Sequence, residues 1–273
     1  MTLQISDDFD LERIAQSGQC FRWEKIDDKT YRITALDECL YVEKIGKTEF
    51  AFDCDEETFQ AKWHSYFDLD EDYRKIRRRI DRENDPFLHT AAGKERGIRI
   101  LRQDPWEMLI SFIISQNRNI PAIQKSIELL SEACGQKKKD SRGEYYHCFP
   151  TAKALSRLSD QSLEKCRLGY RAKYVTAAAK AVCEGAIDFH ELTAMSSEDA
   201  ITELTKLYGV GVKVANCVAL FGLHQLNAFP IDVWVKRILE NEYKEGYPFE
   251  KYAPYNGVYQ QYMFAYYRKV VMD

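Results

Sequence analysis

The chain has 273 residues, of which 45% are hydrophobic and 30% are charged, so it is long enough for one large or two modest globular domains. No run approaches the roughly 18–20 apolar residues that a membrane span requires, and the acidic start MTLQISDDFD is unlike a signal peptide, so we expect no membrane partner and a cytoplasmic or nucleoid location. Residues 1–72 carry 19 acidic and 8 basic side chains, whereas residues 73–273 carry 24 acidic and 31 basic ones. The larger part is therefore a candidate for binding a polyanion, although most charge runs are only a solvated face.

The first fifty residues predict an antiparallel sheet. Four short segments are rich in aromatic and β-branched residues and are separated by turn residues: 20–25, 30–36, 39–45 and 48–52. From Asp55 onward the apolar period lengthens, because Phe59, Trp63 and Phe67 follow one another at a spacing of four. Asp55 stands where it can cap the helix that this spacing predicts.

Helical periodicity then continues toward the end of the chain. We predict helices at 70–81, 104–116, 120–134, 171–184, 196–207, 212–222, 232–241 and 256–271. The segment GQKKKDSRG at 135–143 is predicted to be a loose surface loop. The fold class is therefore α+β, with an N-terminal antiparallel sheet domain and its flanking helices at residues 1–95, and a larger α-helical domain at residues 96–273.

The cysteines do not form a metal-binding pattern. No two of the eight are closer than 14 positions, which excludes ligation of the C-x-x-C kind. We expect reduced, mostly buried thiols, no metal held by side chains and no required cofactor.

The stretch KLYGVGVKVANCVALFG at 206–222 predicts a helix, a glycine turn and a second, buried helix. Gly209 and Gly211 permit positive φ and close approach, so the turn can present amide groups at a helix N-terminus, a surface that binds phosphate. The plainer interpretations are a helix C-cap at the glycines, a solvated lysine at Lys213 and a simple N-cap at Asp232 in NAFPID.

The combination L-x-G-x-G-x-K followed by P-x-D resembles the helix-hairpin-helix DNA glycosylases, in which a lysine at this position marks the bifunctional glycosylase/lyases. Four further motifs make the chain similar to the 8-oxoguanine DNA glycosylases of the HhH-GPD superfamily: SGQCFRW at 17–23, LRQDPWEMLISFIISQN at 101–117, LGYRAKYV at 168–175 and PYNGVYQQYMF at 254–264. The absence of a cysteine cluster after the aspartate separates the chain from the iron–sulfur branches. The resemblance implies a helix-hairpin-helix body and a double-stranded DNA substrate containing 8-oxoguanine.

The resemblance also implies the catalytic residues. Lys213 would attack C1′ of the sugar, expel the base and form a Schiff base that permits β-elimination, while Asp232 would assist deprotonation and stabilise the cationic sugar. Only the neutral amine attacks; partial burial and the helix N-terminus favour it, and the carboxylate of Asp232 opposes it.

A base inside a duplex must be flipped out before it can be recognised. By resemblance, Cys217 packs on one face of the flipped base and Phe264 on the other, Gln260 meets the base edge, and the carbonyl of Gly18 accepts a hydrogen bond from the N7–H that only the oxidised base carries. Without the resemblance, Gln260 would be taken as a surface amide and Gly18 as a turn glycine.

On the DNA, Asn117 and Tyr170 match gap-filling positions, and Arg171 matches a residue that binds the estranged cytosine. The family's second cytosine-reading arginine corresponds to Ala122, which predicts relaxed selectivity for the opposite base.

Two smaller departures lie nearby: Tyr208 replaces a common hairpin proline, and Trp234 replaces a frequent phosphate-contacting histidine. The resemblance further implies a monovalent cation held by backbone carbonyls around Lys206 to Val212, and a monomer. Two alternatives stay open, namely a non-catalytic helix-hairpin-helix DNA-binding protein and a glycosylase for alkylated bases.

Overall fold

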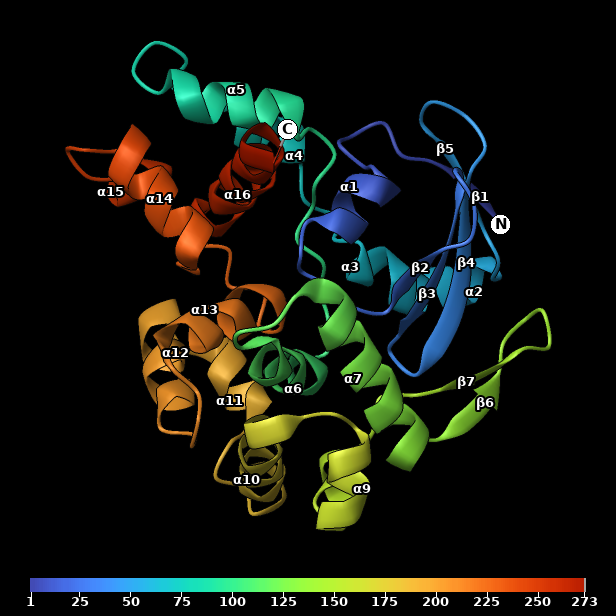
Figure 1. The fold of residues 1–273 in the computed structure, drawn as a ribbon. Coiled ribbons are helices and arrows are strands. Elements are labelled where there is room, and N and C mark those ends of the chain that lie inside the picture. The colour runs from blue at the N-terminus through green and yellow to red at the C-terminus, as the bar shows by residue number, and fades with distance from the viewer. Residues whose placement is uncertain (273) are drawn as a thin grey trace.

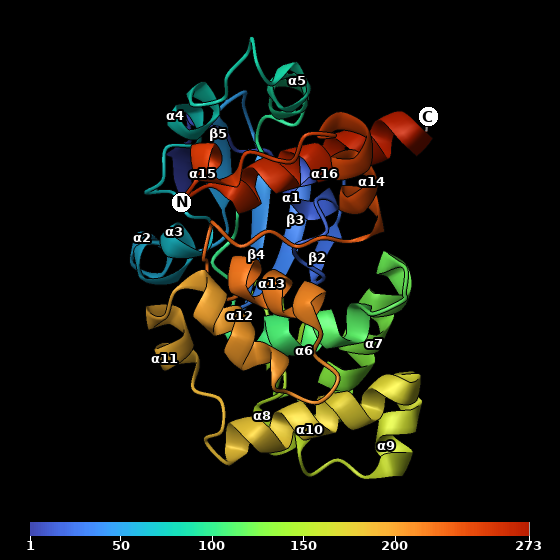
Figure 2. The same cartoon turned by 90° about the vertical axis from the view of Figure 1, so that its left-hand side faces the viewer.

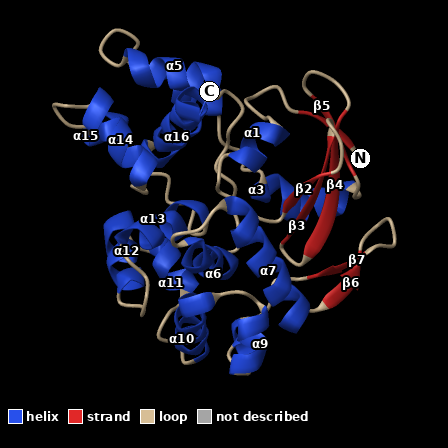
Figure 3. Ribbon diagram, in the orientation of Figure 1, coloured by secondary structure: helices blue, strands red, loops and turns tan. Residues whose placement is uncertain are grey.

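The sheet occupies the N-terminal part of the computed structural model, which describes residues 1–272 (Figure 1 and Figure 3). Its five antiparallel strands follow the order β1-β5-β4-β3-β2. Their bounds are β1 Thr2–Gln4, β2 Trp23–Lys25, β3 Thr30–Ala35, β4 Glu38–Lys44 and β5 Glu49–Phe52. The four predicted segments all contain strands. β1 was not predicted, because three residues are too few to show alternation.

One face of the sheet packs on α1 (Leu11–Gln16) and on a continuous helical stretch formed by α2 (Glu56–Thr58), a π-helical turn (Phe59–Trp63) and α3 (His64–Tyr66). Asp55 begins this stretch and accepts a hydrogen bond from the Thr58 amide at 2.7 Å, so the predicted cap is confirmed. Phe59, Trp63 and Phe67 are buried in an aromatic cluster that forms the core of this part of the chain.

The remainder is helical, and the predicted α+β class is confirmed. The helices are α4 Tyr73–Arg78, α5 Pro86–Lys94, α6 Pro105–Ser115, α7 Ile120–Cys134, α8 Ala152–Leu155, α9 Asp160–Lys165, a 3₁₀ turn Gly169–Arg171, α10 Ala172–Cys183, α11 Phe189–Ala194, α12 Ser197–Thr205, α13 Val212–Phe221, α14 Val233–Glu242, α15 Phe249–Tyr252 and α16 Asn256–Met272. All eight predicted helices are present within a few residues. The ones missed have nine residues or fewer and show too little periodicity.

The helices share one large core, separate from that of the sheet. In Figure 1 they form two groups, α4, α5 and α14–α16 beside α6–α13, and Figure 2 shows α16 crossing above α13. α4 and α5 lie within the segment 1–95, yet their apolar side chains, among them Tyr73 and Leu88, are buried in the large core. The N-terminal sheet is thus bordered by helices that pack with the C-terminal end of the chain.

The segment 135–143 is not a loose loop, so that prediction is wrong. β6 (Lys137–Lys139) pairs with β7 (Tyr145–His147) in a hairpin. At its tip, Asp140 accepts hydrogen bonds from Arg32 Nη2 and Tyr41 Oη, both at 2.9 Å, and from the amides of Arg142 and Glu144. The hairpin is ordered because its polar residues bind the N-terminal sheet.

The eight cysteines are free thiols, of which Cys20, Cys148, Cys166 and Cys217 are buried and Cys183 is exposed. Across residues 1–272, no helix is both long and apolar enough to cross a membrane. The same residues contain no group of three or more His, Cys, Asp or Glu side chains arranged to hold a metal ion.

Candidate active site

The glycine turn between α12 and α13 is held against α10. Gly209 has φ +83°, and a Cβ built on it would lie 2.2 Å from Cγ of Tyr174, so only glycine fits both the backbone and the packing. Gly211 has an ordinary φ of −92° and open space around it, so it needs neither positive φ nor close approach. It is the N-cap of α13, which has no side-chain cap, and the first amides of the helix are therefore available to an anion.

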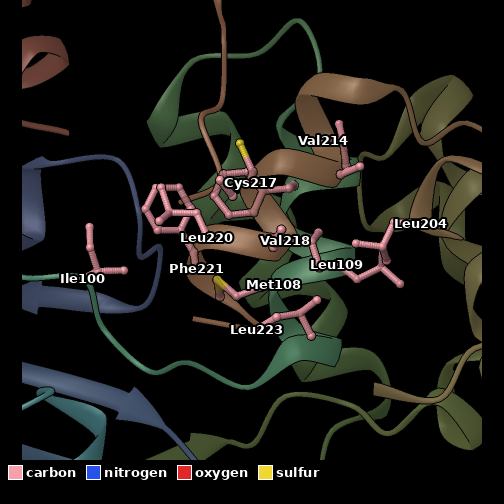
Figure 4. Packing of buried hydrophobic residues seen from close by; sticks show 14 of the residues in the cluster. Ile100, Met108, Leu109, Leu204, Val214, Cys217, Val218, Leu220, Phe221 and Leu223 are labelled. Atoms are coloured by element: carbon pink, nitrogen blue, oxygen red, sulfur yellow. The ribbon is translucent and has the colours of Figure 1, made fainter. Parts of the chain in front are cut away.

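Lys213 projects from the first turn of α13, and its ammonium lies 5.3 Å from the ring centroid of Phe112. The remainder of α13 is buried: Figure 4 shows Val214, Cys217, Val218 and Phe221 among side chains of α6 and α12. The lysine is thus half-buried at the mouth of a buried helix, as the sequence predicts.

Both predicted catalytic residues, Lys213 and Asp232, influence the thiol of Cys217. Burial raises the pKa of its thiol, Lys213 lowers that pKa as a neighbouring charge and hydrogen-bond donor, and Asp232 raises it. The thiol is neutral at physiological pH and lies within the influence of both. Lys213 forms no salt bridge with any carboxylate in the part of the chain that the structure describes.

Asp232 caps α14, as its position predicts. Its Oδ1 accepts hydrogen bonds from the amides of Trp234 and Val235, each at 2.9 Å, which leaves Oδ2 available for other chemistry. The segment before it is fixed by Asn216, whose Oδ1 accepts from the Phe229 amide at 3.0 Å while its Nδ2 donates to the Val212 carbonyl. Asn216, which sequence reasoning missed, ties the aspartate segment to the lysine helix.

The predicted base-binding residues come from opposite ends of the chain. Gly18 has φ +81°, and the position of a Cβ on it would lie 3.6 Å from the ring of Phe264, so these two residues are neighbours. Gln260 is buried, and its Nε2 donates to the carbonyl of Pro230 at 3.1 Å, two residues before Asp232.

Gln19 fixes the loop that contains Gly18. Like Asn216, it is a residue whose role sequence reasoning missed. Its Nε2 donates to Ser17 Oγ and to the Arg99 carbonyl, and its Oε1 accepts from the Leu101 amide, all at 2.8 Å. A buried amide that satisfies three partners holds the neighbouring carbonyl in a defined direction.

The predicted gap-filling residues are adjacent. Asn117 has φ +52° and donates from Nδ2 to the hydroxyl of Tyr170 at 3.3 Å. Arg171 is 7% exposed and donates to the carbonyls of Gln116 and Leu168, so in this structure its guanidinium faces inward. Gln116 also donates to the Gly209 carbonyl at 3.0 Å. It thereby joins the segment that carries Asn117 to the turn between α12 and α13, the hairpin of the helix-hairpin-helix motif.

Known protein families match most of the chain. Residues 2–109 match the family model of the 8-oxoguanine DNA glycosylase N-terminal domain, and residues 110–244 match that of the HhH-GPD superfamily of base excision DNA repair proteins. An N-glycosylase/DNA lyase of Saccharomyces cerevisiae is 32% identical over 264 residues, which cover 86% of this chain and 68% of the yeast protein. The chain belongs to the 8-oxoguanine DNA glycosylase family.

Two further members of this glycosylase family extend the comparison. N-glycosylase/DNA lyase OGG1 of Arabidopsis thaliana is 39% identical over 163 residues, but this match covers 58% of the chain and only 44% of the plant protein. The structure of the Clostridium acetobutylicum 8-oxoguanine glycosylase/lyase, in complex with double-stranded DNA containing cytosine opposite 8-oxoguanine, superposes with a TM-score of 0.90. It is 34% identical and covers 99% of this chain and 98% of that one. The present glycosylase is therefore a DNA repair enzyme of the N-glycosylase/DNA lyase class.

The positions at which this glycosylase departs from the family pattern lie on its surface. Ala122 is half-buried in the first turn of α7, with its amide bound to the Asn119 side chain. Trp234 lies at the start of α14. The guanidinium carbon of Arg237 lies over its ring, 5.1 Å from the ring centroid. Neither Ala122 nor Trp234 can donate a charge-assisted hydrogen bond to DNA.

Proposed function

We propose that this glycosylase excises 8-oxoguanine from duplex DNA through a Schiff base on Lys213 and then cleaves the abasic strand by β-elimination. The observation that carries the proposal is the convergence of Lys213 and Asp232 on the buried Cys217, in the second turn of α13, whose first amides are open to a phosphate. The hairpin positions DNA, and the lysine stands beside it.

The chemistry begins with the neutral Lys213 amine. It attacks C1′ as the N-glycosidic bond breaks, and the base leaves with the bonding pair and takes up a proton. The substituted amine loses one proton, and cleavage of the C1′–O4′ bond, with O4′ taking up a proton, then gives the iminium. The carboxylate of Asp232, which keeps Oδ2 available while it caps α14, stabilises the positive charge that develops on the sugar. Loss of a C2′ proton then expels the 3′ phosphate by cleavage of the C3′–O bond, and water releases the lysine.

Recognition of the lesion rests on one proton. The carbonyl of Gly18 would accept from N7–H of 8-oxoguanine and confront a lone pair on N7 of guanine, a difference of about 1–3 kcal/mol when buried. The neutral thiol of Cys217 and the ring of Phe264 supply apolar contacts to the two faces of the base. Gln260 would read the edge of the base, and its bond to Pro230 would align the aspartate segment at the same time.

Selectivity for the opposite base is proposed to be relaxed. One cytosine-reading arginine is absent because Ala122 occupies its position, and Arg171 is engaged by backbone carbonyls. Asn117 and Tyr170 would still fill the gap left by the flipped base, whatever base stands opposite.

The turn at residues 206–212 is proposed to hold a monovalent cation. It contains no acidic side chain, and the Leu207 carbonyl, which accepts from the Val210 amide, keeps a second acceptor position. Backbone carbonyls of the turn are neutral oxygen ligands, which fit a singly charged ion. Such an ion would add positive charge beside the DNA phosphate. We further propose that the enzyme acts as a monomer in the cytoplasm or nucleoid.

Single-turnover excision tests the proposed function. Duplexes carrying 8-oxoguanine, guanine or an alkylated purine at one position are incubated with the enzyme, and released base and strand cleavage are measured separately. Release of 8-oxoguanine with accompanying strand cleavage is expected. Release of the alkylated purine alone would assign the other lesion class, and base release without strand cleavage would contradict the lyase step.

A second assay tests the role of Ala122. Excision opposite each of the four bases should vary little in the wild type, and Ala122→Arg should restore a preference for cytosine, because a guanidinium can donate to its acceptors. A steep cytosine preference in the wild type would contradict the relaxed selectivity.

A further inference from the structure

Tyr208 presents an exposed aromatic ring on the turn between α12 and α13. The residue is 58% exposed. Its ring is nevertheless held, because its centroid lies 5.0 Å from that of Tyr174 at an interplanar angle of 83°. Tyr174 in turn makes an edge-to-face contact with Tyr170 at 5.9 Å. These three residues, which we call the tyrosine row, connect the predicted gap-filling residue to the hairpin.

A lysine lies over the hairpin end of this row. Lys173 is exposed in the first turn of α10, and its ammonium is 5.4 Å from the ring centroid of Tyr174 and 5.6 Å from that of Tyr208. A hydrogen bond with the Tyr208 hydroxyl raises the pKa of Lys173, so the lysine is charged at neutral pH. Two aromatic faces that attract a cation thus hold the ammonium at a defined place.

Lys173 has its charge available for a ligand. It forms no salt bridge with a carboxylate anywhere in residues 1–272, whereas Lys206, at the other side of the same turn, is paired with Glu203 at 2.5 Å. Tyr208 directly precedes Gly209, so Lys173 and the Tyr208 hydroxyl border the same turn that presents the open amides of α13. Positive potential therefore continues from the helix N-terminus onto α10.

We propose that the Lys173 ammonium and the Tyr208 hydroxyl bind a second backbone phosphate of the DNA strand that the hairpin holds. This inference rests on the proposed function and adds to it a contact made by this chain's own residues. Ammonium and hydroxyl are both donors, and a phosphate offers only acceptors, whereas base edges offer a mixture. The contact therefore strengthens binding to DNA of any sequence and contributes nothing to recognition of the lesion.

The salt dependence of DNA binding measures such a contact. Affinity for an undamaged duplex, which under the proposed function is not a substrate, is determined at a series of salt concentrations between about 50 and 200 mM. Each neutralised phosphate contributes about 0.9 to the slope of log K against log salt, so Lys173→Gln should reduce the slope by about one. Lys173→Arg should retain it. Tyr208→Phe should keep the slope and weaken binding by about threefold to tenfold.

Lys47→Gln is the matched control, because it removes another exposed cation, from the turn between β4 and β5, away from the turn between α12 and α13 (Figure 1). Its slope should equal that of the wild type. An unchanged slope in Lys173→Gln, or an equal fall in both variants, would overturn the proposed contact. Excision of 8-oxoguanine by the wild type is measured alongside. If it fails, the proposed function falls, while the comparison of slopes still decides the phosphate contact.

Discussion

Gly209, in the turn between α12 and α13, allows the backbone cost of positive φ to be separated from the cost of overlap with a neighbouring side chain. In Gly209→Ala, the new methyl group would meet Cγ, Cδ1 and Cδ2 of Tyr174 at 2.2, 2.3 and 2.6 Å. Positive φ costs a non-glycine residue about 1–2 kcal/mol, and overpacking of this kind costs about 1–3 kcal/mol. We therefore expect Gly209→Ala to lower the free energy of unfolding by about 2–5 kcal/mol, measured by urea denaturation.

Gly143→Ala supplies the reference for the backbone alone. Gly143 has the same φ of +83°, but no atom lies within 4 Å of the position of its Cβ, so its substitution should cost only the backbone part. The difference between the two variants isolates the overlap with Tyr174. Equal losses of stability in the two variants would refute the account of the turn between α12 and α13.

The functional effect should follow the same difference. Displacing the hairpin moves the amides at the start of α13, so Gly209→Ala should also weaken DNA binding by about tenfold or more, whereas Gly143→Ala should not. In a Tyr174→Ala background the overlap disappears, and the two glycine variants should then cost about the same.

Two other predictions concern titratable groups. Asp232→Asn should slow excision by about 100-fold or more while retaining DNA affinity, because asparagine still caps α14; complete loss of binding would make the role of Asp232 structural. Burial raises the pKa of Glu107 from 4.5 to about 7, so its contribution to stability is complete below pH 4.5 and is lost as pH rises toward 7. Glu107→Gln should remove this dependence and be more stable than the wild type at pH 8 by up to about 3 kcal/mol, with nearly equal stability at about pH 4. Parallel stability curves for the two proteins would contradict the assignment.

The sequence predicts the parts of the fold that depend on local pattern. α6, α7, α13 and α16 carry apolar residues at helical spacing over ten or more residues, and they lie within a few residues of their predicted bounds. The β6–β7 hairpin was missed because its order depends on Asp140, whose partner Arg32 lies 108 positions earlier. No local pattern carries that contact.

In the candidate site, too, the residues that follow a local pattern could be predicted and those that make long-range contacts could not. The spacing of Lys213 and Cys217 on one helix, and the N-cap at Asp232, could be inferred from the sequence alone. Asn216 and Gln116, which join these elements, could not, because an amide that binds a distant backbone leaves no periodic signal. A polar residue on a mostly buried helix, such as Asn216, is the only hint that the sequence offers.

The central claim is that Lys213 is the nucleophile, and borohydride trapping tests it most directly. Wild-type enzyme is incubated with a duplex carrying 8-oxoguanine in the presence of borohydride, which reduces a Schiff base to a stable covalent adduct. The account predicts an adduct with the wild type and none with Lys213→Gln. Equal trapping by the two proteins would contradict it.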